Sequence, residues 1–231
     1  GTLGVVDPDR GETVAMSVAG LSIAGARGRI VQDDAAIAAW LNVSDAAGGA
    51  AAWNFAAPGD AFARMRADES VAISYTLRAT DTAGASGDRV VTVTVNGRND
   101  APALVVGDGN SAGATVAARP GTLAASGTLG IVDPDAGDTA SVSVVSVSVD
   151  GARGRIDLDD AAIAALMGVE AGRAAWSFSA PGEAFGRLRA GESATLAYTL
   201  RVTDAAGATG ERAVTIVVEG RNDAPALVVG A

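Results

Sequence analysis

The sequence contains no cysteine and no histidine, and aromatic residues make up only 4% of its 231 positions. Without cysteine there are no disulfide bonds and no thiolate metal sites. Without histidine there are no imidazole ligands, and the commonest general base is missing. Any metal site therefore has to use oxygen ligands, as calcium sites do. With so few aromatic residues, the core has to be built mainly from Val, Ile, Leu and Ala.

Long apolar runs and positive charge are also scarce. No stretch approaches the length that crosses a bilayer, and no charged segment followed by apolar residues begins the sequence. The formal net charge is −10, which argues against nucleic acid and acidic membranes as partners and fits cations instead. No serine or acidic pair has a partner base, so we expect no enzyme activity. We expect a soluble segment that does not insert directly into a membrane.

A long internal repeat organises the whole sequence. "GTLGVVDPDRGET" at 1–13 returns as "GTLGIVDPDAGDT" at 127–139, and "YTLRATDTAGASGDR" at 75–89 returns as "YTLRVTDAAGATGER" at 198–212. Roughly two thirds of the aligned positions are identical, which indicates a tandem array.

The ends of the sequence do not coincide with the ends of this repeat. "APALVV" at 101–106 opens the second copy and recurs near the C-terminus, but it has no counterpart before Gly1. We therefore expect a first repeat over 1–100 that lacks its first strand, a second, complete repeat over 101–223, and the first strand of a third repeat over 224–231. The natural protein is then expected to be longer in both directions.

Short runs of alternating apolar residues predict β-strands. In the second repeat these runs are 104–106, 127–132, 140–149, 153–157, 174–178, 194–202 and 211–218. Leu196, Tyr198, Leu200 and Val202 share one face, so one side of their strand should be buried. About seven short strands in a repeat of roughly 120 residues predict an all-β class of tandem immunoglobulin-like, cadherin-like β-sandwiches.

A few segments interrupt the strand pattern. Alanine-rich stretches at 33–41 and 159–167 follow an acidic capping residue, which predicts two short helices. The Pro-Gly-x-Ala-Phe segments predict a further helical turn anchored by Phe62 and Phe185. Other side chains are assigned structural roles: a solvated strand face for Arg27, Arg29, Arg153 and Arg155, packing for Trp53 and Trp176, and hydrogen bonds to backbone groups for Tyr75 and Tyr198.

Carboxylates gather at corresponding places in the two repeats. The first repeat carries Asp7 and Asp9 around a proline, followed by Glu12, and the second carries Asp133, Asp135 and Asp138. Neighbouring carboxylates repel one another unless a cation neutralises them, and calcium accepts six to eight oxygen ligands in flexible geometry. This pattern predicts a calcium site.

Additional ligands are expected from loops at the same end of the sandwich. Asp81 and Asp204 follow the long tyrosine-containing strand of each repeat. The hexapeptide "GRNDAP" occurs at 97–102 and 220–225, and in a tandem array it would bring Asn99 and Asp100 to the acidic loop of the following repeat. Asn222 and Asp223 are the same residues in the second copy, where we expect a site that is incomplete and weak.

Each motif also has a purely structural interpretation. Asp-Pro-Asp-x-Gly forms a turn without any metal, and Asn-Asp before Ala-Pro is compatible with a polar linker whose proline ends a strand. The acidic pairs Asp33/Asp34 and Asp159/Asp160 are interpreted as helix caps.

The order of "GTLGIVDPDAGDT", "WSFSAP" and "AVTIVVEGRNDAP" resembles the VCBS repeat. Such repeats occur in very large bacterial surface adhesins and secreted calcium-dependent proteins and are related to cadherin-like domains. The resemblance covers essentially the whole chain. It implies tandem sandwiches with calcium at or near their junctions, and by analogy with cadherins it implies Glu69 as a further ligand, with Glu192 at the same position of the second repeat.

Together these features predict a calcium-stiffened extracellular spacer of a giant bacterial adhesin or surface protein, acting in cell adhesion or biofilm formation. Its partners would be neighbouring repeats of the same chain and, through other domains, cell-surface or matrix glycans. Two alternatives stay open at this stage. One is a structural repeat of a filament or surface layer, and the other is a glycan-binding module.

Overall fold

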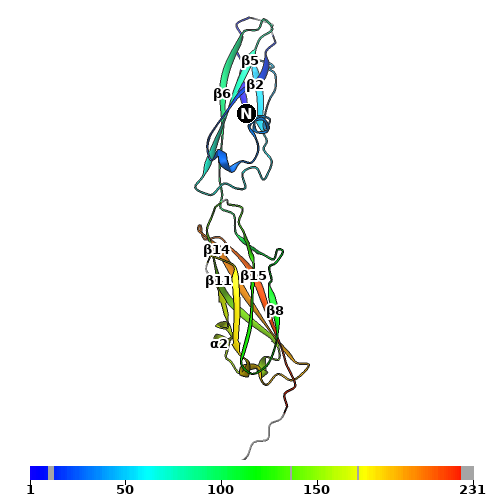
Figure 1. The fold of residues 1–231 in the computed structure, drawn as a ribbon. Coiled ribbons are helices and arrows are strands. Elements are labelled where there is room, and N and C mark those ends of the chain that lie inside the picture. Colours follow the sequence, from blue (N-terminus) through cyan, green and yellow to red (C-terminus); the bar gives the residue numbers. More distant parts are fainter. Residues whose placement is uncertain (10–12, 136, 171, 225–231) are drawn as a thin grey trace, which may run out of the picture. The chain divides into compact units, whose positions relative to one another are not determined.

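The computed structural model describes residues 1–9, 13–135, 137–170 and 172–224 (Figure 1). Strands dominate the chain, and the predicted all-β class is confirmed. The chain divides into two compact units. Unit 1 contains residues Gly1–Asp100 with a short segment around Asp135, and unit 2 contains the remainder from Ala101.

Unit 1 is built from two three-stranded sheets with a hydrophobic core. One sheet has the order β1-β4-β3 and the other β2-β5-β6, and all their pairings are antiparallel. The elements are β1 (Thr2–Gly4), β2 (Ala15–Gly25), η1 (Arg27–Arg29), α1 (Asp34–Ala38), β3 (Leu41–Val43), β4 (Ala50–Phe55), β5 (Ser70–Thr80) and β6 (Ser86–Asn96).

Unit 2 repeats this plan and has three further strands, β7, β8 and β10, among the described residues. Its sheets have the orders β12-β13-β9, β11-β14-β15-β8 and β10-β7. The elements are β7 (Ala103–Val105), β8 (Gly113–Ala117), β9 (Thr122–Thr128), β10 (Gly130–Val132), β11 (Ala140–Gly151), η2 (Arg153–Arg155), α2 (Asp160–Ala164), β12 (Met167–Val169), β13 (Ala175–Pro181), η3 (Gly182–Phe185), β14 (Ser193–Asp204) and β15 (Thr209–Glu219).

The central strand of each larger sheet organises its unit. β14 pairs along its length with β11 on one edge and β15 on the other, and its alternate side chains are buried. Leu196, Tyr198, Leu200 and Val202 are fully buried, as the alternation predicts. Each such side chain contributes about 1.5–3 kcal/mol by leaving water. β5 has the same role in unit 1.

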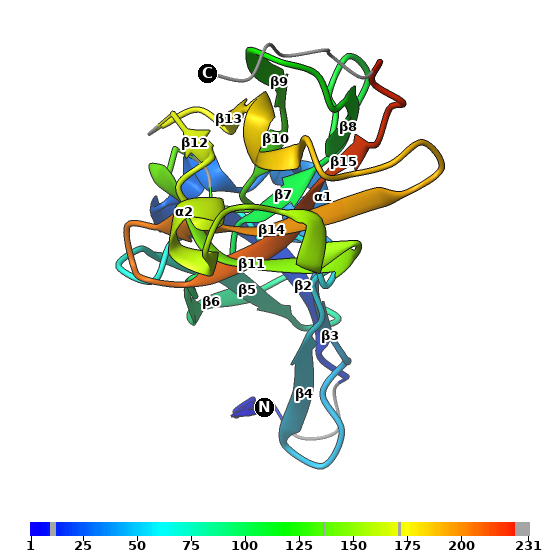
Figure 2. The same ribbon diagram turned by 90° about the horizontal axis from the view of Figure 1, so that it is seen from below.

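Both predicted short helices are present. Asp33 caps α1 by accepting a hydrogen bond from the Ala36 N–H at 2.8 Å, and Asp159 caps α2 through the Ala162 N–H at 2.7 Å. α2 lies beside β11 (Figure 2). The apolar residue of each helix faces the core, where the central tyrosine donates its hydroxyl to a helix carbonyl: Tyr75 to Ile37 and Tyr198 to Ile163, both at 2.8 Å. The predicted backbone role of the tyrosines is confirmed.

The prediction of an arginine-lined strand over 153–157 is wrong. Gly151, at φ 81°, ends β11, and Arg153–Arg155 then form a single 3-10 turn. The Arg153 guanidinium folds over the following loop and donates to the Leu158 carbonyl at 3.0 Å and to Asp160 at 2.7 Å. These local bonds satisfy the backbone without a strand partner. In unit 1, Arg27 of η1 makes the corresponding contact with Asp34, the first residue of α1.

The short strands β8 and β12 were not predicted. Their sequences, GATVA and MGV, carry glycine and too few alternating residues to stand out from loops. Each is stabilised by pairing with another strand, because β8 pairs in parallel with the distant β15 and β12 pairs with β13.

No helix in the described ranges is long and apolar enough to cross a membrane.

The repeat provides a matched test of core packing. Phe185 is fully buried in unit 2, whereas its counterpart Phe62 only partly packs against the core of unit 1. We predict that Phe185→Ala lowers the free energy of unfolding by about 3–5 kcal/mol, because it leaves a cavity. Phe62→Ala should cost clearly less. Urea unfolding of both variants measures the difference, and equal losses would contradict this assignment of the core.

Candidate metal centre

In unit 1, two of the predicted ligands line one hollow. Asp7 follows β1, and Asp81 follows β5 at the start of the turn to β6. Both border a hollow of about 220 Å³, together with Pro8, Val14 and Ala85. Segments distant in the sequence therefore bring two carboxylates to one place.

The two carboxylates differ in how their oxygens are satisfied. Asp7 Oδ1 accepts a hydrogen bond from the Asp9 N–H at 2.9 Å, and Asp81 Oδ1 accepts one from the Ala85 N–H at 2.9 Å. Asp7 Oδ2 is buried, and it has no hydrogen-bond partner among the residues that the structure describes. A buried oxygen left in this state costs free energy, which a cation beside it would recover.

Unit 2 contains the corresponding residues on corresponding elements. Asp204, at the end of β14, is 7% exposed and accepts a hydrogen bond from the Ala208 N–H at 2.8 Å, as Asp81 does from Ala85. Asp138 is partly buried and lies two residues before Ala140, which pairs with Asp204 in the β11–β14 ladder. Asp133 directly follows β10, and its Oδ2 atom is shielded from solvent.

Asp135 is the most deeply buried of the predicted ligands, at 1% exposure. The contacts of its segment assign Asp135 to unit 1. Its Oδ2 atom accepts a hydrogen bond from the Asp100 N–H at 2.7 Å. Asn99 donates its side-chain amide to the Asp100 carbonyl at 3.3 Å. Across the described part of the chain, the buried charged side chains are Asp135 and Asp204. Burial of a carboxylate costs free energy unless the carboxylate is hydrogen-bonded or paired with a positive charge. Both side chains therefore require hydrogen-bond donors or a cation beside them.

Glu69 lies in a basic environment. Both oxygens of its carboxylate accept a hydrogen bond from Arg29 Nε, each at 2.9 Å. The Oε2 atom also accepts a hydrogen bond from the Arg66 N–H at 3.0 Å. The hydrogen bond from Arg29 is the main reason why the pKa of Glu69 lies below its ordinary value of 4.5. A role as a metal ligand would require this ion pair to open. Glu192 makes the corresponding contacts in unit 2, with the Arg189 N–H at 2.9 Å and with Arg155 at 3.6 Å.

The remaining predicted ligands are exposed or lie outside the described residues. Asp9, Asn222 and Asp223 are exposed. Glu12 lies outside the described residues, as do residues 225–231 of the segment predicted to begin a third repeat. Among the residues that are described, no three His, Cys, Asp or Glu side chains are grouped as a metal site. A calcium ion bound here would therefore depend on backbone carbonyls or water for much of its coordination.

Two features of this region were not predicted from the sequence. One is the pairing of Arg29 with Glu69, which lie 40 positions apart. The other is the turn-capping role of Asp81 and Asp204. Asp followed after two residues by Gly-Ala, in "DTAGA" and "DAAGA", is a turn signal that could have indicated the second.

Comparison with known proteins identifies no family. No family model matches the chain, and no curated protein matches it. Its neighbours among solved structures are cadherin extracellular domains. The protocadherin GammaB4 extracellular domain matches with a TM-score of 0.42 and 16% identity over 87% of this chain and 27% of that chain. Drosophila N-cadherin EC1-4 matches with a TM-score of 0.41 and 14% sequence identity, over 94% of this chain and 44% of that chain.

Human mucin-like protocadherin EC1-2 matches with a TM-score of 0.42 and 12% identity, over 88% of this chain and 86% of that chain. This chain therefore spans well under two thirds of the first two structures. The scores and identities are too low to support a functional conclusion.

The Arg29–Glu69 pair leads to a prediction about pH. Because the pKa of Glu69 is lowered in the folded state, the pair stabilises unit 1 above the unfolded pKa, and this stabilisation is lost as the pH falls through the folded pKa. Glu69→Gln should therefore lower the melting temperature at neutral pH and have little effect well below pH 4.5, where the wild-type carboxyl is protonated as well. Thermal melts across pH measure this.

Asp68→Asn is the matched control, because it removes the exposed carboxylate next to Glu69 and leaves the Arg29–Glu69 pair in place. An equal loss for Glu69→Gln at both pH values would instead assign its contribution to packing.

Proposed function

We propose that this chain is a segment of a calcium-stiffened extracellular spacer in a large bacterial surface protein. The observation that carries the proposal is the hollow of unit 1, which is lined by Asp7 and Asp81 and contains a buried Asp7 oxygen. Carboxylate oxygens from two separate loops suit a hard cation with flexible coordination, which favours calcium over magnesium.

Corresponding residues of the two units would hold calcium. In unit 1 they are Asp7 and Asp81, with Asp9 and Glu12 as further candidates from the same loop. In unit 2 they are Asp133, Asp138 and Asp204, which stand at the corresponding positions. We further propose that Asn99, Asp100 and Asp135 contribute where "GRNDAP" connects consecutive repeats.

The chemistry supplied by the ion is electrostatic. When bound, calcium would neutralise carboxylates that otherwise repel one another, and it would join the turn after the central strand, which carries Asp81, to the loop before β2, which carries Asp7. The protein side chains then hold their loops in a fixed arrangement. A repeat that is stabilised in this way, in an array without disulfides, suits a spacer that projects an adhesive domain from a cell surface and so serves cell adhesion or biofilm formation.

A glycan-binding function of the repeats themselves finds less support. Trp176 is 2% exposed and donates its indole N–H to the Ser111 carbonyl at 2.8 Å, so its ring is not available to stack on a sugar. Trp53 is partly buried and packs against the core of unit 1. Glycan partners, if the full protein has them, are therefore assigned to other domains.

Calcium should stabilise the folded chain. Affinities of extracellular calcium modules are about 10⁻⁴–10⁻³ M, and a ligand at about 100 times its Kd stabilises by about 2.7 kcal/mol. We predict a higher melting temperature in calcium than in chelator, and a smaller increase for Asp7→Asn and Asp81→Asn. Asp88→Asn is the control, because Asp88 pairs with Arg78 on the strand face. Calorimetry with the same increase in all variants would exclude the hollow as the site.

Stiffening is a separate expectation with its own measurement. Small-angle scattering of the chain in calcium and in chelator should give different maximum dimensions, because a flexible linker averages over many arrangements. If calcium raises the melting temperature but leaves the scattering curve unchanged, the ion stabilises individual repeats and the spacer proposal fails.

A further inference from the structure

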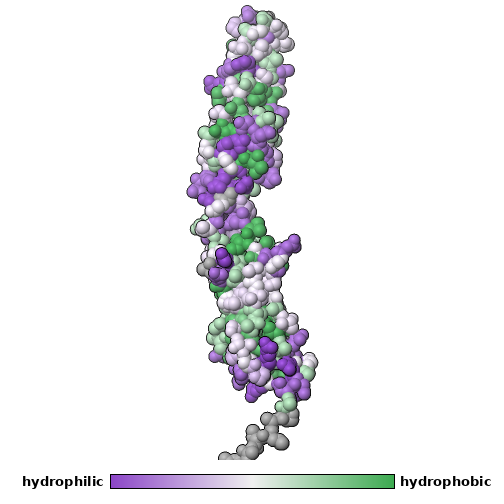
Figure 3. All heavy atoms as spheres, viewed as in Figure 1, coloured by the Kyte–Doolittle hydropathy of each residue, from purple (hydrophilic) through white to green (hydrophobic). Residues whose placement is uncertain are grey.

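The two copies of "GRNDAP" begin with a glycine that is held in the same way. Gly97 directly follows β6 in unit 1, and Gly220 directly follows β15 in unit 2. The Gly97 N–H donates to the Glu69 carbonyl at 2.9 Å, and the Gly220 N–H donates to the Glu192 carbonyl at 2.9 Å. On the face drawn in Figure 3, hydrophilic residues gather over the end of unit 1 where the chain continues towards unit 2. The start of the linker is therefore attached to a corresponding glutamate in both units.

Both glycines are required by the close approach of another backbone segment. A Cβ added to Gly97 would lie 2.1 Å from the Arg66 carbonyl oxygen, and one added to Gly220 would lie 2.1 Å from the Arg189 carbonyl oxygen. Neither glycine has a positive φ, so its own backbone conformation does not require it. The linker thus lies directly on the turn that begins at each of these arginines.

The glutamate side chain closes this turn. In unit 1 the Glu69 N–H donates to the Arg66 carbonyl at 3.0 Å, and the Arg66 N–H donates to Glu69 Oε2 at 3.0 Å. In unit 2 the two hydrogen bonds between Glu192 and Arg189 are both 2.9 Å long. Reciprocal bonds between a side chain and nearby backbone groups fix the backbone of a turn. A glutamate that turned away to bind a metal would open the turn on which the linker glycine lies.

An arginine from another segment holds the glutamate of unit 1. The Ala26 N–H, just before η1, donates to the Ser70 carbonyl at 2.9 Å, and this bond places η1 beside Glu69. Arg29 of η1 then donates from Nε to both carboxylate oxygens at 2.9 Å, and its Nη2 atom lies 2.8 Å from Oε1. Three segments distant in sequence therefore meet at this glutamate.

Unit 2 has the same arrangement with a looser ion pair. The Ala152 N–H donates to the Ser193 carbonyl at 2.9 Å, and Arg155 Nη2 lies 3.6 Å from Glu192 Oε1. This distance allows an ion pair but is too long for a hydrogen bond. The two side chains are 38% and 32% exposed, compared with 24% for both members of the pair in unit 1. The pair should therefore contribute more in unit 1.

The arginine also occupies the place that a cation would need. Hydrogen bonds from Arg29 and from the Arg66 N–H already engage both oxygens of the Glu69 carboxylate. A guanidinium stays charged wherever the protein is folded, and it repels a second cation at the same oxygens. Calcium would have to displace this ion pair before it could bind Glu69.

We propose that the start of the linker after each repeat is fixed by an exit clasp that needs no calcium, and that Glu69 and Glu192 are positioning residues of this clasp and not calcium ligands. The exit clasp consists of Arg29, Glu69 and Gly97 in unit 1, and of Arg155, Glu192 and Gly220 in unit 2.

The exit clasp is separate from the proposed calcium site of its unit. Asp81 follows the end of β5, whereas Glu69 precedes the start of this strand of 11 residues. A strand rises by about 3.3 Å per residue, so the two carboxylates cannot hold the same ion. The exit clasp therefore does not rest on the proposed function, and it assigns calcium to the opposite end of β5.

The first experiment measures hydrogen exchange of the linker glycines by NMR in chelator. The Gly97 and Gly220 amides should be protected without calcium. Glu69→Gln and Arg29→Gln should each speed the exchange of Gly97 by about fivefold or more, and the double variant should add little, because both changes break one interaction. Glu192→Gln should have a smaller effect on Gly220. Protection that appears only with calcium, or single variants that leave the exchange of Gly97 unchanged, would overturn the proposal.

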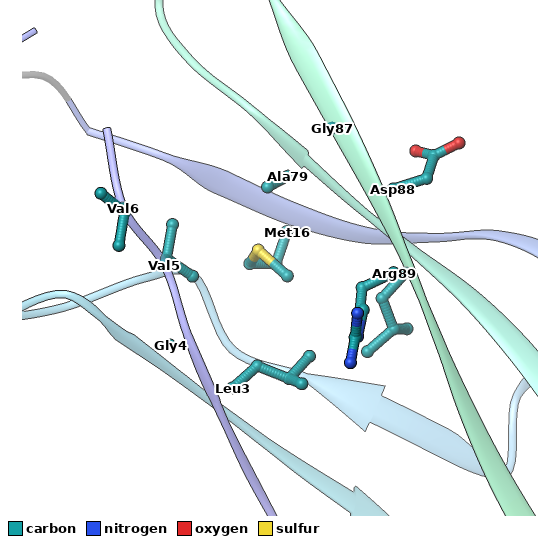
Figure 4. A pocket seen from close by; sticks show the side chains of 10 residues that line it. Leu3, Gly4, Val5, Val6, Met16, Ala79, Gly87, Asp88 and Arg89 are labelled. Carbon is teal, nitrogen blue, oxygen red and sulfur yellow. The ribbon is translucent and has the colours of Figure 1, made fainter. Parts of the chain in front are cut away.

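Arg78→Gln is the matched control for the loss of an ion pair. It breaks the contact between Arg78 and Asp88, which is 2.8 Å long and also lies in unit 1. In Figure 4 the Asp88 carboxylate points away from Leu3 and Met16, which line a hollow of about 430 Å³ in unit 1. This variant should leave the exchange of Gly97 unchanged. Equal acceleration would assign the effect to overall stability and would overturn the proposal.

The second experiment tests the glycine contact by limited proteolysis in chelator. Gly97→Ala places a Cβ against the Arg66 carbonyl, so we predict that trypsin cleaves after Arg98 about tenfold faster than in the parent chain. Gly28→Ala is the control, because nothing lies within 4 Å of the added Cβ. Circular dichroism melts check that both variants are folded. Equal cleavage rates in the two variants would contradict the exit clasp, and the exchange experiment decides if Gly97→Ala does not fold.

Calcium is tested separately. Glu69→Gln and Glu192→Gln should retain the increase in melting temperature that calcium gives to the parent chain. Loss of this increase in Glu69→Gln, with the increase retained in Asp88→Asn, would identify Glu69 as a ligand and overturn the proposal. If the parent chain shows no increase, the calcium proposal fails, and the exchange results in chelator still decide whether the exit clasp exists.

Discussion

The central strand of each unit is the element on which the rest of the repeat depends. β5 and β14 are paired on both edges over nearly their whole length, and their inward side chains are almost completely buried. That burial determines the register, because a shift by one residue would expose every apolar side chain of the strand. The register in turn places Asp81 and Asp204 at the strand ends and a tyrosine hydroxyl under each short helix.

The acidic residues at these strand ends have two physical roles that are compatible. As turn caps, Asp81 and Asp204 each accept a backbone N–H within their own loop, which requires no metal. A carboxylate has two oxygens and several lone pairs, so capping leaves capacity for a cation. The hollow beside Asp7 shows where such a cation has room, while the Arg29–Glu69 pair shows that other acids of the repeat are neutralised within the protein.

Two copies of one sequence pattern also separate what a repeat needs for folding from what it needs for contact with a neighbouring strand. Gly25 and Gly151 are required in both units, because each has a positive φ and lies against a serine carbonyl. Gly87 and Gly210 are different, since only Gly210 has a contact that excludes a side chain. In unit 2 the glycine is therefore required by the close approach of Pro102, just before β7, and not by the conformation of its own backbone.

Local pattern was enough to predict much of this protein from sequence. Alternation predicted the all-β class and the buried face of β14, because a strand with one face in the core has to repeat every second residue. Asp33 and Asp159 predicted both helix starts, since capping acts within three residues. Other features depend on contacts between distant segments. The pairing of β8 with β15, the Arg29–Glu69 ion pair and the fit of Pro102 against Gly210 have no local signature. Only the folded chain decides them, because the partner that makes each arrangement favourable is supplied by another part of the structure.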